Sequence, residues 1–91
     1  MINEQFINYL TDLYENIFEE SVTNSKEFII FVQDKNPHPL RIKVEELIEE
    51  RTELLYQYPY GSIDNKILWE KIIAMHELDT LITNYIENNN V

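Results

Sequence analysis

The stretch from residue 62 to residue 88 constrains the fold most, because it has the pattern of a long helix that is apolar on two sides. At about 100° per residue, one stripe collects Ile67, Leu68, Ala74, Met75, Leu78, Leu81, Ile82, Tyr85 and Ile86. A second, smaller patch lies roughly opposite and holds Trp69 and Ile73, with His76 beside them. A helix with two apolar faces needs two neighbours, or one neighbour and a partner protein. We therefore expect this helix at the centre of the fold, with Trp69, Ile73 and His76 as candidate partner-binding residues.

The length and composition indicate one folded domain. The chain has 91 residues, and 44% of them are apolar, including six Tyr, four Phe and one Trp. That content is too high for a disordered acidic tail, and the length allows a modest core. No apolar run approaches the roughly 18–20 residues of a membrane span. The first residues lack the basic and apolar regions of a signal peptide. The expected location is therefore the cytoplasm.

Several kinds of chemistry are disfavoured by the residues present. The chain has no cysteine, and its two histidines, His38 and His76, belong to no metal-binding motif. With Gly61 as the single glycine, a glycine-rich phosphate loop cannot be built. We therefore expect no metal site and no cofactor, and find no motif of an enzyme by spacing alone.

The strongest global feature is the net charge of −10. Such a charge disfavours direct binding to a nucleic acid or to an anionic membrane, which would repel the chain. A basic protein surface, such as a nucleic-acid-binding channel, would attract it. Simple solubility is the alternative meaning of the charge.

The first half of the chain predicts a helix followed by a small sheet. Residues 3–20 have the 3.6-residue periodicity of an amphipathic helix, with Asn3 as a plausible N-cap. Residues 28–32 form a short apolar run, and Pro37 and Pro39 follow it. Beyond the prolines, apolar residues alternate with Arg41 and Lys43, so residues 27–44 favour a two-stranded β-hairpin. A helix across residues 27–33 is the alternative.

The second half predicts two antiparallel helices. Residues 45–57 continue the helical pattern, residues 58–62 form a short turn with Gly61, and Ser62 or Asp64 would cap the last helix. The expected fold class is thus mainly α (α+β): a helix at residues 1–20, a hairpin at 27–44 and a helical hairpin at 45–88 in one domain. In this arrangement Lys43 falls near Asp79, and we expect an ion pair there.

A row of carboxylates lies along the first helix of that pair. Offsets of three and four residues place these groups on one side of the helix; the acidic row consists of Glu45, Glu46, Glu49, Glu50 and Glu53. A regular row of negative charge can imitate part of a phosphate backbone and occupy a basic groove. A solvated helix face is the alternative.

Among single residues, Asp79 stands out by its position on the predicted helix. It lies at the edge of the main apolar stripe of the last helix, about 100° from Leu78. A carboxylate in that position is either paired, with Lys43 the expected partner, or presented at the rim of an interface.

Residues 77–85, Glu-Leu-Asp-Thr-Leu-Ile-Thr-Asn-Tyr, resemble a family signature. They are similar to the Ser-Gln-Glu-Leu-Asp-x-Leu-Ile-x-x-Tyr motif of the small sporulation-regulatory aspartyl-phosphate phosphatases, in which two helices are joined by a short turn. Met75 and His76 stand where that motif has Ser and Gln. The resemblance implies a negative regulator that lowers the phosphorylation of a sporulation-type response regulator. It also implies that Asp79 is the catalytic carboxylate and that Glu77, Leu78 and Tyr85 belong to the contact helix.

Two other functions remain open at this point. Small size, strong acidity and the lack of cysteine resemble those of phage anti-CRISPR and other anti-defence inhibitors, which implies a basic nucleic-acid-binding protein as the partner. The third possibility is a self-associating structural module in which Trp69 and Ile73 form a homodimer contact. All three make the chain a protein that acts by binding another protein.

Overall fold

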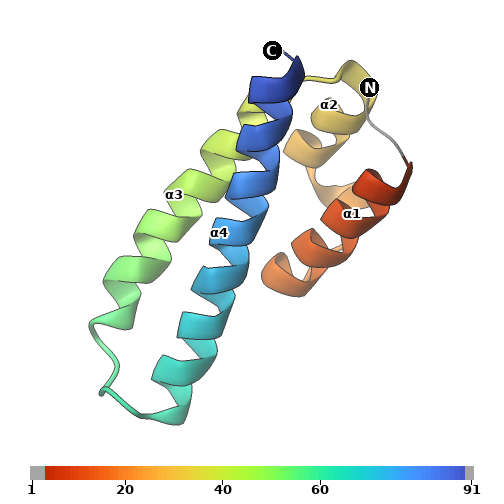
Figure 1. The fold of residues 1–91 in the computed structure, drawn as a ribbon. Coiled ribbons are helices and arrows are strands. Elements are labelled where there is room, and N and C mark those ends of the chain that lie inside the picture. Colours follow the sequence, from red (N-terminus) through yellow and green to blue (C-terminus); the bar gives the residue numbers. More distant parts are fainter. Residues whose placement is uncertain (1–3, 90–91) are drawn as a thin grey trace.

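The computed structural model describes residues 4–89, and these residues form an all-α fold. The elements are α1 (Glu4–Phe18), the short 3-10 helix η1 (Val22–Asn24), α2 (Lys26–Asp34), α3 (His38–Leu55) and α4 (Ile63–Asn89). Figure 1 shows α3 and α4 side by side as an antiparallel pair, with α1 and α2 on the other side of α4. The predicted helices at residues 3–20 and 62–88 are confirmed within a few residues, although Asn3 lies outside the described residues.

The predicted β-hairpin at residues 27–44 is wrong, because residues 4–89 contain no strand. This segment instead forms α2, a short linker and the first turns of α3. Ser25 starts α2: its buried side-chain oxygen accepts the backbone N–H of Phe28 at 3.2 Å. Lys35, with a φ of 55°, ends it in the left-handed conformation. The helix that we considered as the alternative for residues 27–33 is the observed structure.

The two prolines begin a helix here rather than a strand. Pro37 is the N-cap of α3 and Pro39 lies in its first turn, where no backbone N–H has an intrahelical acceptor to lose. Leu40 and Val44, four residues apart, are both buried, whereas Ile42 between them is 55% exposed. The apparent alternation was therefore the i, i+4 spacing of a helix face, and the expected α+β class is corrected to all-α.

The helical hairpin at residues 45–88 is confirmed, and its first helix starts earlier than expected, at His38. Ser62 caps α4, since its side-chain oxygen accepts the backbone N–H of Asn65 at 3.1 Å. Gly61 provides the left-handed residue of the turn, with a φ of 84°.

The core lies between α4 and its neighbours. α4 packs against α3 and α1, while α2 packs against α3. The buried apolar cluster consists of Leu10, Tyr14, Ile17, Phe28, Phe31, Leu40, Val44, Met75, Leu78, Ile82 and Tyr85. The main stripe of α4 thus serves both of its neighbours, as expected of a central helix. The opposite patch at Trp69 and Ile73 is covered by no described element and stays about half exposed.

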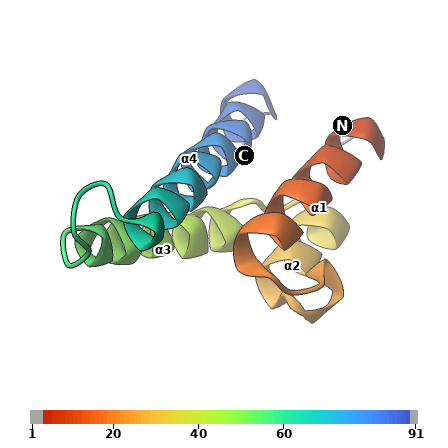
Figure 2. The same ribbon diagram turned by 90° about the horizontal axis from the view of Figure 1, so that it is seen from below.

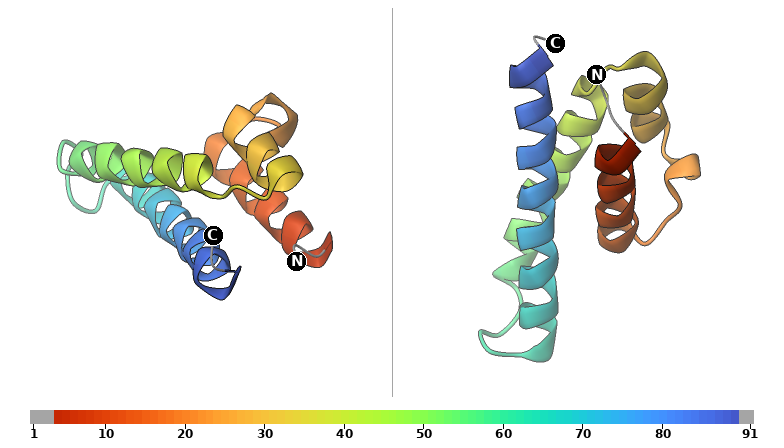
Figure 3. Two further views of the ribbon diagram at one scale, coloured as in Figure 1. Left: turned by 90° about the horizontal axis from the view of Figure 1, so that it is seen from above. Right: turned by 45° about the vertical axis from the view of Figure 1, so that its right-hand side comes forward.

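The helices α1 and α2 cover only one end of the long hairpin. In the right-hand view of Figure 3, α1 runs beside part of α4, and the end of the hairpin that carries the turn projects beyond it. The view from below in Figure 2 has the same arrangement, with α1 and α2 away from the turn. The molecule is accordingly elongated, with extents of 43 × 23 × 20 Å. The turn end of the hairpin therefore has open surface on several sides.

Lys43 connects the covering helices to α3. Its Nζ lies 2.8 Å from the hydroxyl oxygen of Tyr14, 3.5 Å from a carboxylate oxygen of Glu20 and 3.4 Å from one of Glu27. The ammonium also lies over the rings of Tyr14 and Phe18, at 5.4 and 5.0 Å from their centroids. One side chain of α3 thus contacts α1, α2 and Glu20, which follows the end of α1.

This cluster leaves no role for the expected pair of Lys43 with Asp79. Lys43 points toward α1 and α2, while Asp79 lies near groups on the α3–α4 side, so the predicted ion pair is wrong. The hydroxyl of Tyr14 donates to Glu20 at 2.7 Å, and this bond, with the charge of Lys43, lowers the pKa of the Glu20 carboxyl. Partial burial works against the charge of Lys43, but Tyr14 and the two carboxylates outweigh it and raise the pKa of the ammonium.

Replacing Lys43 should destabilise the fold. We expect Lys43→Ala to lower the free energy of unfolding by about 1–2 kcal/mol, because it removes two ion pairs, one hydrogen bond and ring contacts at a partly exposed site. Urea denaturation followed by circular dichroism measures this change. The control is Lys66→Ala, since Lys66 is exposed and has no ion pair within residues 4–89. Equal losses in the two variants at neutral pH would contradict this role of Lys43.

The stabilisation from Glu20 is present above the unfolded-state pKa of a glutamate and is lost as the pH falls through its lowered folded-state pKa.

Candidate functional site

Asp79 occupies an unusual place on α4. Its Oδ1 is buried and has no hydrogen-bond partner, and it is the only side-chain oxygen or nitrogen in residues 4–89 with that combination. Buried polar atoms are nearly always paired with protein groups or with water, so one without a protein partner marks strain, a functional group or a place for a bound water. Asp79 is therefore the first candidate for a functional carboxylate.

The groups around Asp79 form a small polar cluster between α3 and α4. Burial raises the pKa of the Asp79 carboxyl, and the negative charge of Glu45 on α3 raises it further, while Arg41 and His76 oppose the shift. Arg41 is itself held by Glu45, with 3.1 Å between Nε and Oε1. A carboxylate of raised pKa beside an imidazole can hold and orient a water molecule, which is the chemistry of a general base. No cluster of metal-ligating side chains exists within residues 4–89.

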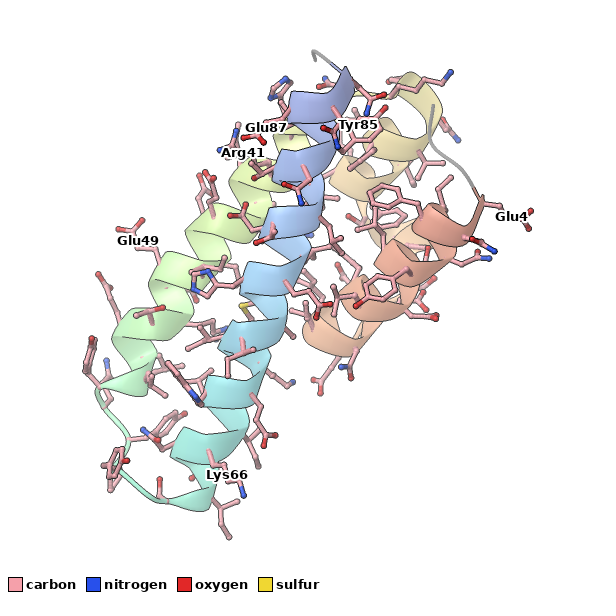
Figure 4. All side chains as sticks on the ribbon, viewed as in Figure 1. Glu4, Arg41, Glu49, Lys66, Tyr85 and Glu87 are labelled. Atoms are coloured by element: carbon pink, nitrogen blue, oxygen red, sulfur yellow. The ribbon has the colours of Figure 1, made fainter. Side chains whose placement is uncertain are left out.

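Two residues predicted to contact a partner lie in the core instead. Leu78 and Tyr85 are buried, and the ring of Tyr85 lies 5.0 Å from that of Phe31 on α2. Figure 4 shows the Tyr85 side chain on the side of α4 that faces α1 and α2. Glu77 is exposed, but it accepts a hydrogen bond from the Tyr9 hydroxyl of α1. Within residues 77–85, the apolar positions of the motif are thus packing positions, and Asp79 is the residue that packing does not explain.

The remaining three predicted contact residues are available on the surface. Trp69 and Ile73 are 51% and 52% exposed, and His76 is exposed as well. Tyr56 at the end of α3 is 84% exposed and lines the same groove as Trp69. We call Trp69 and Ile73 the apolar patch.

The acidic row is also on the surface. All five glutamates are exposed. Glu45 pairs with Arg41, and Glu50 lies 3.9 Å from the guanidinium of Arg51. The other three, Glu46, Glu49 and Glu53, have no ion pair or hydrogen bond to another described side chain. Figure 4 shows Glu49 pointing away from α4 into open space.

The edge of the acidic row that Glu45 and Glu49 form lies on the same flank of the hairpin as the apolar patch. Glu45 lies near Asp79 at one end, and Tyr56 lies beside Trp69 at the other. Glu49 is one turn from Glu45 on the same helix face, so it falls between these two points. We call this surface the hairpin flank: the acidic row with the apolar patch and His76.

Sequence reasoning missed two features of this region. Arg41 stands in a predicted strand, and its position near Asp79 follows only once α3 begins at His38. The grouping of Tyr56, Tyr60 and Lys66 around Trp69 was also missed, although three tyrosines within five residues were a visible signal.

Comparisons with known proteins do not extend these findings. No family model, no curated protein and no solved structure matches the chain. Among the helices of residues 4–89, none combines the length and the apolar content needed to cross a membrane.

Neutralising Asp79 should stabilise the protein. Because the folded-state pKa of Asp79 is raised, its ionisation disfavours the folded state, and the lost stability returns as the pH falls through that pKa. We expect Asp79→Asn to be more stable than the wild type at pH 7 by up to about 1 kcal/mol, and the difference to vanish below about pH 4. Thermal denaturation across this pH range measures it, with exposed Asp12→Asn on α1 as the control. A less stable Asp79→Asn at pH 7 would contradict the description of this carboxylate.

Proposed function

We propose that this chain is a small acidic regulatory protein that inhibits another protein by docking the hairpin flank on its basic, nucleic-acid-binding surface. The proposal rests on one observation: the hairpin exposes three glutamates without intramolecular partners together with two half-exposed apolar side chains. The glutamates are Glu46, Glu49 and Glu53, and the apolar side chains are Trp69 and Ile73. The three carboxylates form no ion pair within the described residues, and about half of each apolar side chain is open to a partner.

The spacing of the acidic row suits a surface that binds a phosphate backbone. Residues 45–53 span about 12 Å of helix axis, so the five carboxylates recur roughly every 3 Å. One strand of B-DNA carries one phosphate per about 3.4 Å of axis. The spacing of the carboxylates is therefore similar to that of phosphates, while Arg41 and Arg51 partly offset the charges of Glu45 and Glu50.

The apolar patch would supply binding free energy, which surface charge alone provides only weakly. Surface charges mainly steer a partner and speed its association, while tryptophans buried at the centre of an interface provide much of the binding free energy. Trp69 has the exposure and the position for this role. Charge and apolar contact on one flank together favour a specific protein partner over general solubility.

The same charges disfavour a phosphorylated partner as the first choice. A phosphoryl group carries about −1.5 to −2 charges near neutral pH, and the acidic row beside Asp79 would repel it. The buried, unpartnered Oδ1 of Asp79 nevertheless supports a second candidate function, the negative regulation of a sporulation-type response regulator. In that case Asp79 would orient the water that attacks the aspartyl phosphate, which is positioning rather than covalent catalysis.

Site-directed photo-crosslinking tests the first candidate. With benzoylphenylalanine at exposed Thr80 on α4, we expect a crosslink to a basic nucleic-acid-binding protein in cells of the natural host, and added duplex DNA or RNA should compete with it. The triple variant Glu46→Lys, Glu49→Lys, Glu53→Lys should weaken the crosslink at least tenfold, and so should raised salt.

The matched control changes the net charge equally at other sites. Glu4, Asp12 and Glu70 are exposed and have no ion pair within residues 4–89, so their replacement by lysine should leave the crosslink in place. Equal loss in both triple variants would reduce the effect to net charge and contradict a docking flank. A crosslink to a second copy of the chain would favour self-association through the apolar patch instead.

Phosphate release from a phosphorylated sporulation-type receiver domain tests the second candidate. If Asp79 orients water, the wild type should accelerate release and Asp79→Asn should lose at least tenfold of that acceleration. Asp12→Asn serves as the control that must retain it. No acceleration by the wild type would remove this candidate and leave the first one untouched.

A further inference from the structure

The turn end of the hairpin contains an open groove that shares only Trp69 with the surface of the proposed function. The groove has a cavity volume of about 710 Å³, and its lining includes Tyr56, Tyr58, Tyr60, Trp69 and Lys66. It lies beyond the part of the hairpin that α1 covers, at the lower end in Figure 1, and Figure 4 places Lys66 there. The groove is therefore open to a ligand from solution.

The charge of this groove differs from that of the rest of the molecule. No carboxylate lines it, and Lys66 is its one charged group, although the chain as a whole has a net charge of −10. Lys66 has no ion pair within residues 4–89. The groove is thus a neutral to slightly positive, aromatic site in an acidic protein, and a basic ligand has no partner in it.

The polar atoms of the groove are mainly unused hydrogen-bond donors. Within the described residues, no hydrogen bond involves the hydroxyls of Tyr56, Tyr58 and Tyr60, the indole N–H of Trp69 or the ammonium of Lys66. Indole and ammonium groups can only donate, and phenols donate readily. The remaining polar lining group, the side-chain amide of Asn65, already donates to the backbone carbonyl of Leu55. The best ligand is therefore rich in acceptors, poor in donors and apolar enough to pack on aromatic rings.

A proline-rich segment has this combination of properties. Proline has no backbone N–H, so a polyproline II helix presents carbonyl acceptors and apolar rings and has no internal hydrogen bonds. Its conformation is formed before binding, which lowers the entropic cost of docking. Aromatic-lined grooves with tyrosine and tryptophan donors are a recurring solution for such ligands.

We propose that the groove around Trp69 binds a proline-rich segment of a partner protein in the polyproline II conformation. The rings of the prolines pack against Tyr56, Tyr60 and Trp69, and the indole N–H and Lys66 donate to the carbonyls. This site goes beyond the proposed function, because none of the acidic row takes part in it.

The fluorescence of Trp69 tests the proposal directly, since it is the only tryptophan in the chain. The full chain is titrated with octaproline that is acetylated and amidated, so that the probe carries no charge. We expect a saturable change in emission with octaproline and no such change with a capped Gly-Ser peptide of equal length. Tyr56→Ala and Tyr60→Ala should each weaken binding roughly tenfold, whereas Tyr9→Ala, an exposed tyrosine of α1, should leave it unchanged.

Tyr56 and Tyr60 are 84% and 99% exposed, so we expect both variants to fold, and circular dichroism checks this for each variant. No saturable change, an equal response to the Gly-Ser peptide, or unaltered binding by Tyr60→Ala would overturn the proposal. Saturable binding of oligothymidine in place of octaproline would overturn it too, and would assign the groove to single-stranded nucleic acid. Because octaproline is uncharged, its failure to bind leaves the acidic row and the proposed function standing.

Discussion

The arrangement of the four helices depends on the polar cluster around Lys43. Besides the apolar packing of α2 on α3, this one side chain of α3 contacts Tyr14 of α1, Glu20 just after α1 and Glu27 of α2. Apolar packing alone would hold α1 and α2 near the hairpin, but it is non-directional. The hydroxyl and the two carboxylates fix where the covering helices sit along α3, and so they determine which part of the hairpin stays open.

Along α4, the residues that face α1 and α2 are buried, and those that face the open part of the hairpin are exposed. Toward α1 and α2, Leu78 and Tyr85 belong to the core, although both stand within the stretch that resembles a phosphatase motif. Toward the other side, Trp69 and Ile73 stay about half exposed, because no described element covers the rest of their surface. Asp79 lies at the border, where burial raises its pKa without a hydrogen bond in return. The raised pKa and the unpaired oxygen of Asp79 disfavour the isolated fold, which makes this residue a candidate for function.

The sequence predicted α1 and α4 and missed α2 and the first turns of α3, for a physical reason. Periodicity over the 15 and 27 residues of α1 and α4 distinguishes a helix from a strand. Over the nine residues of α2 it does not, and Leu40, Ile42 and Val44 satisfy both a two-residue and a four-residue spacing. The cap at Ser25 decides the outcome, and its weight is visible only with the structure. The candidate site had the same limit: the edge position of Asp79 was predictable, but its neighbours depend on where α3 begins.

We infer that the hairpin flank and the groove at its turn are free surface for partners other than a second copy of the chain. Sedimentation equilibrium on the purified wild type distinguishes a free flank from a homodimer contact. We expect a monomer of 11.0 kDa at concentrations well above those in cells. A stable species of twice that mass, converted to the monomer by Trp69→Ala, would contradict it and show that the flank is a homodimer contact.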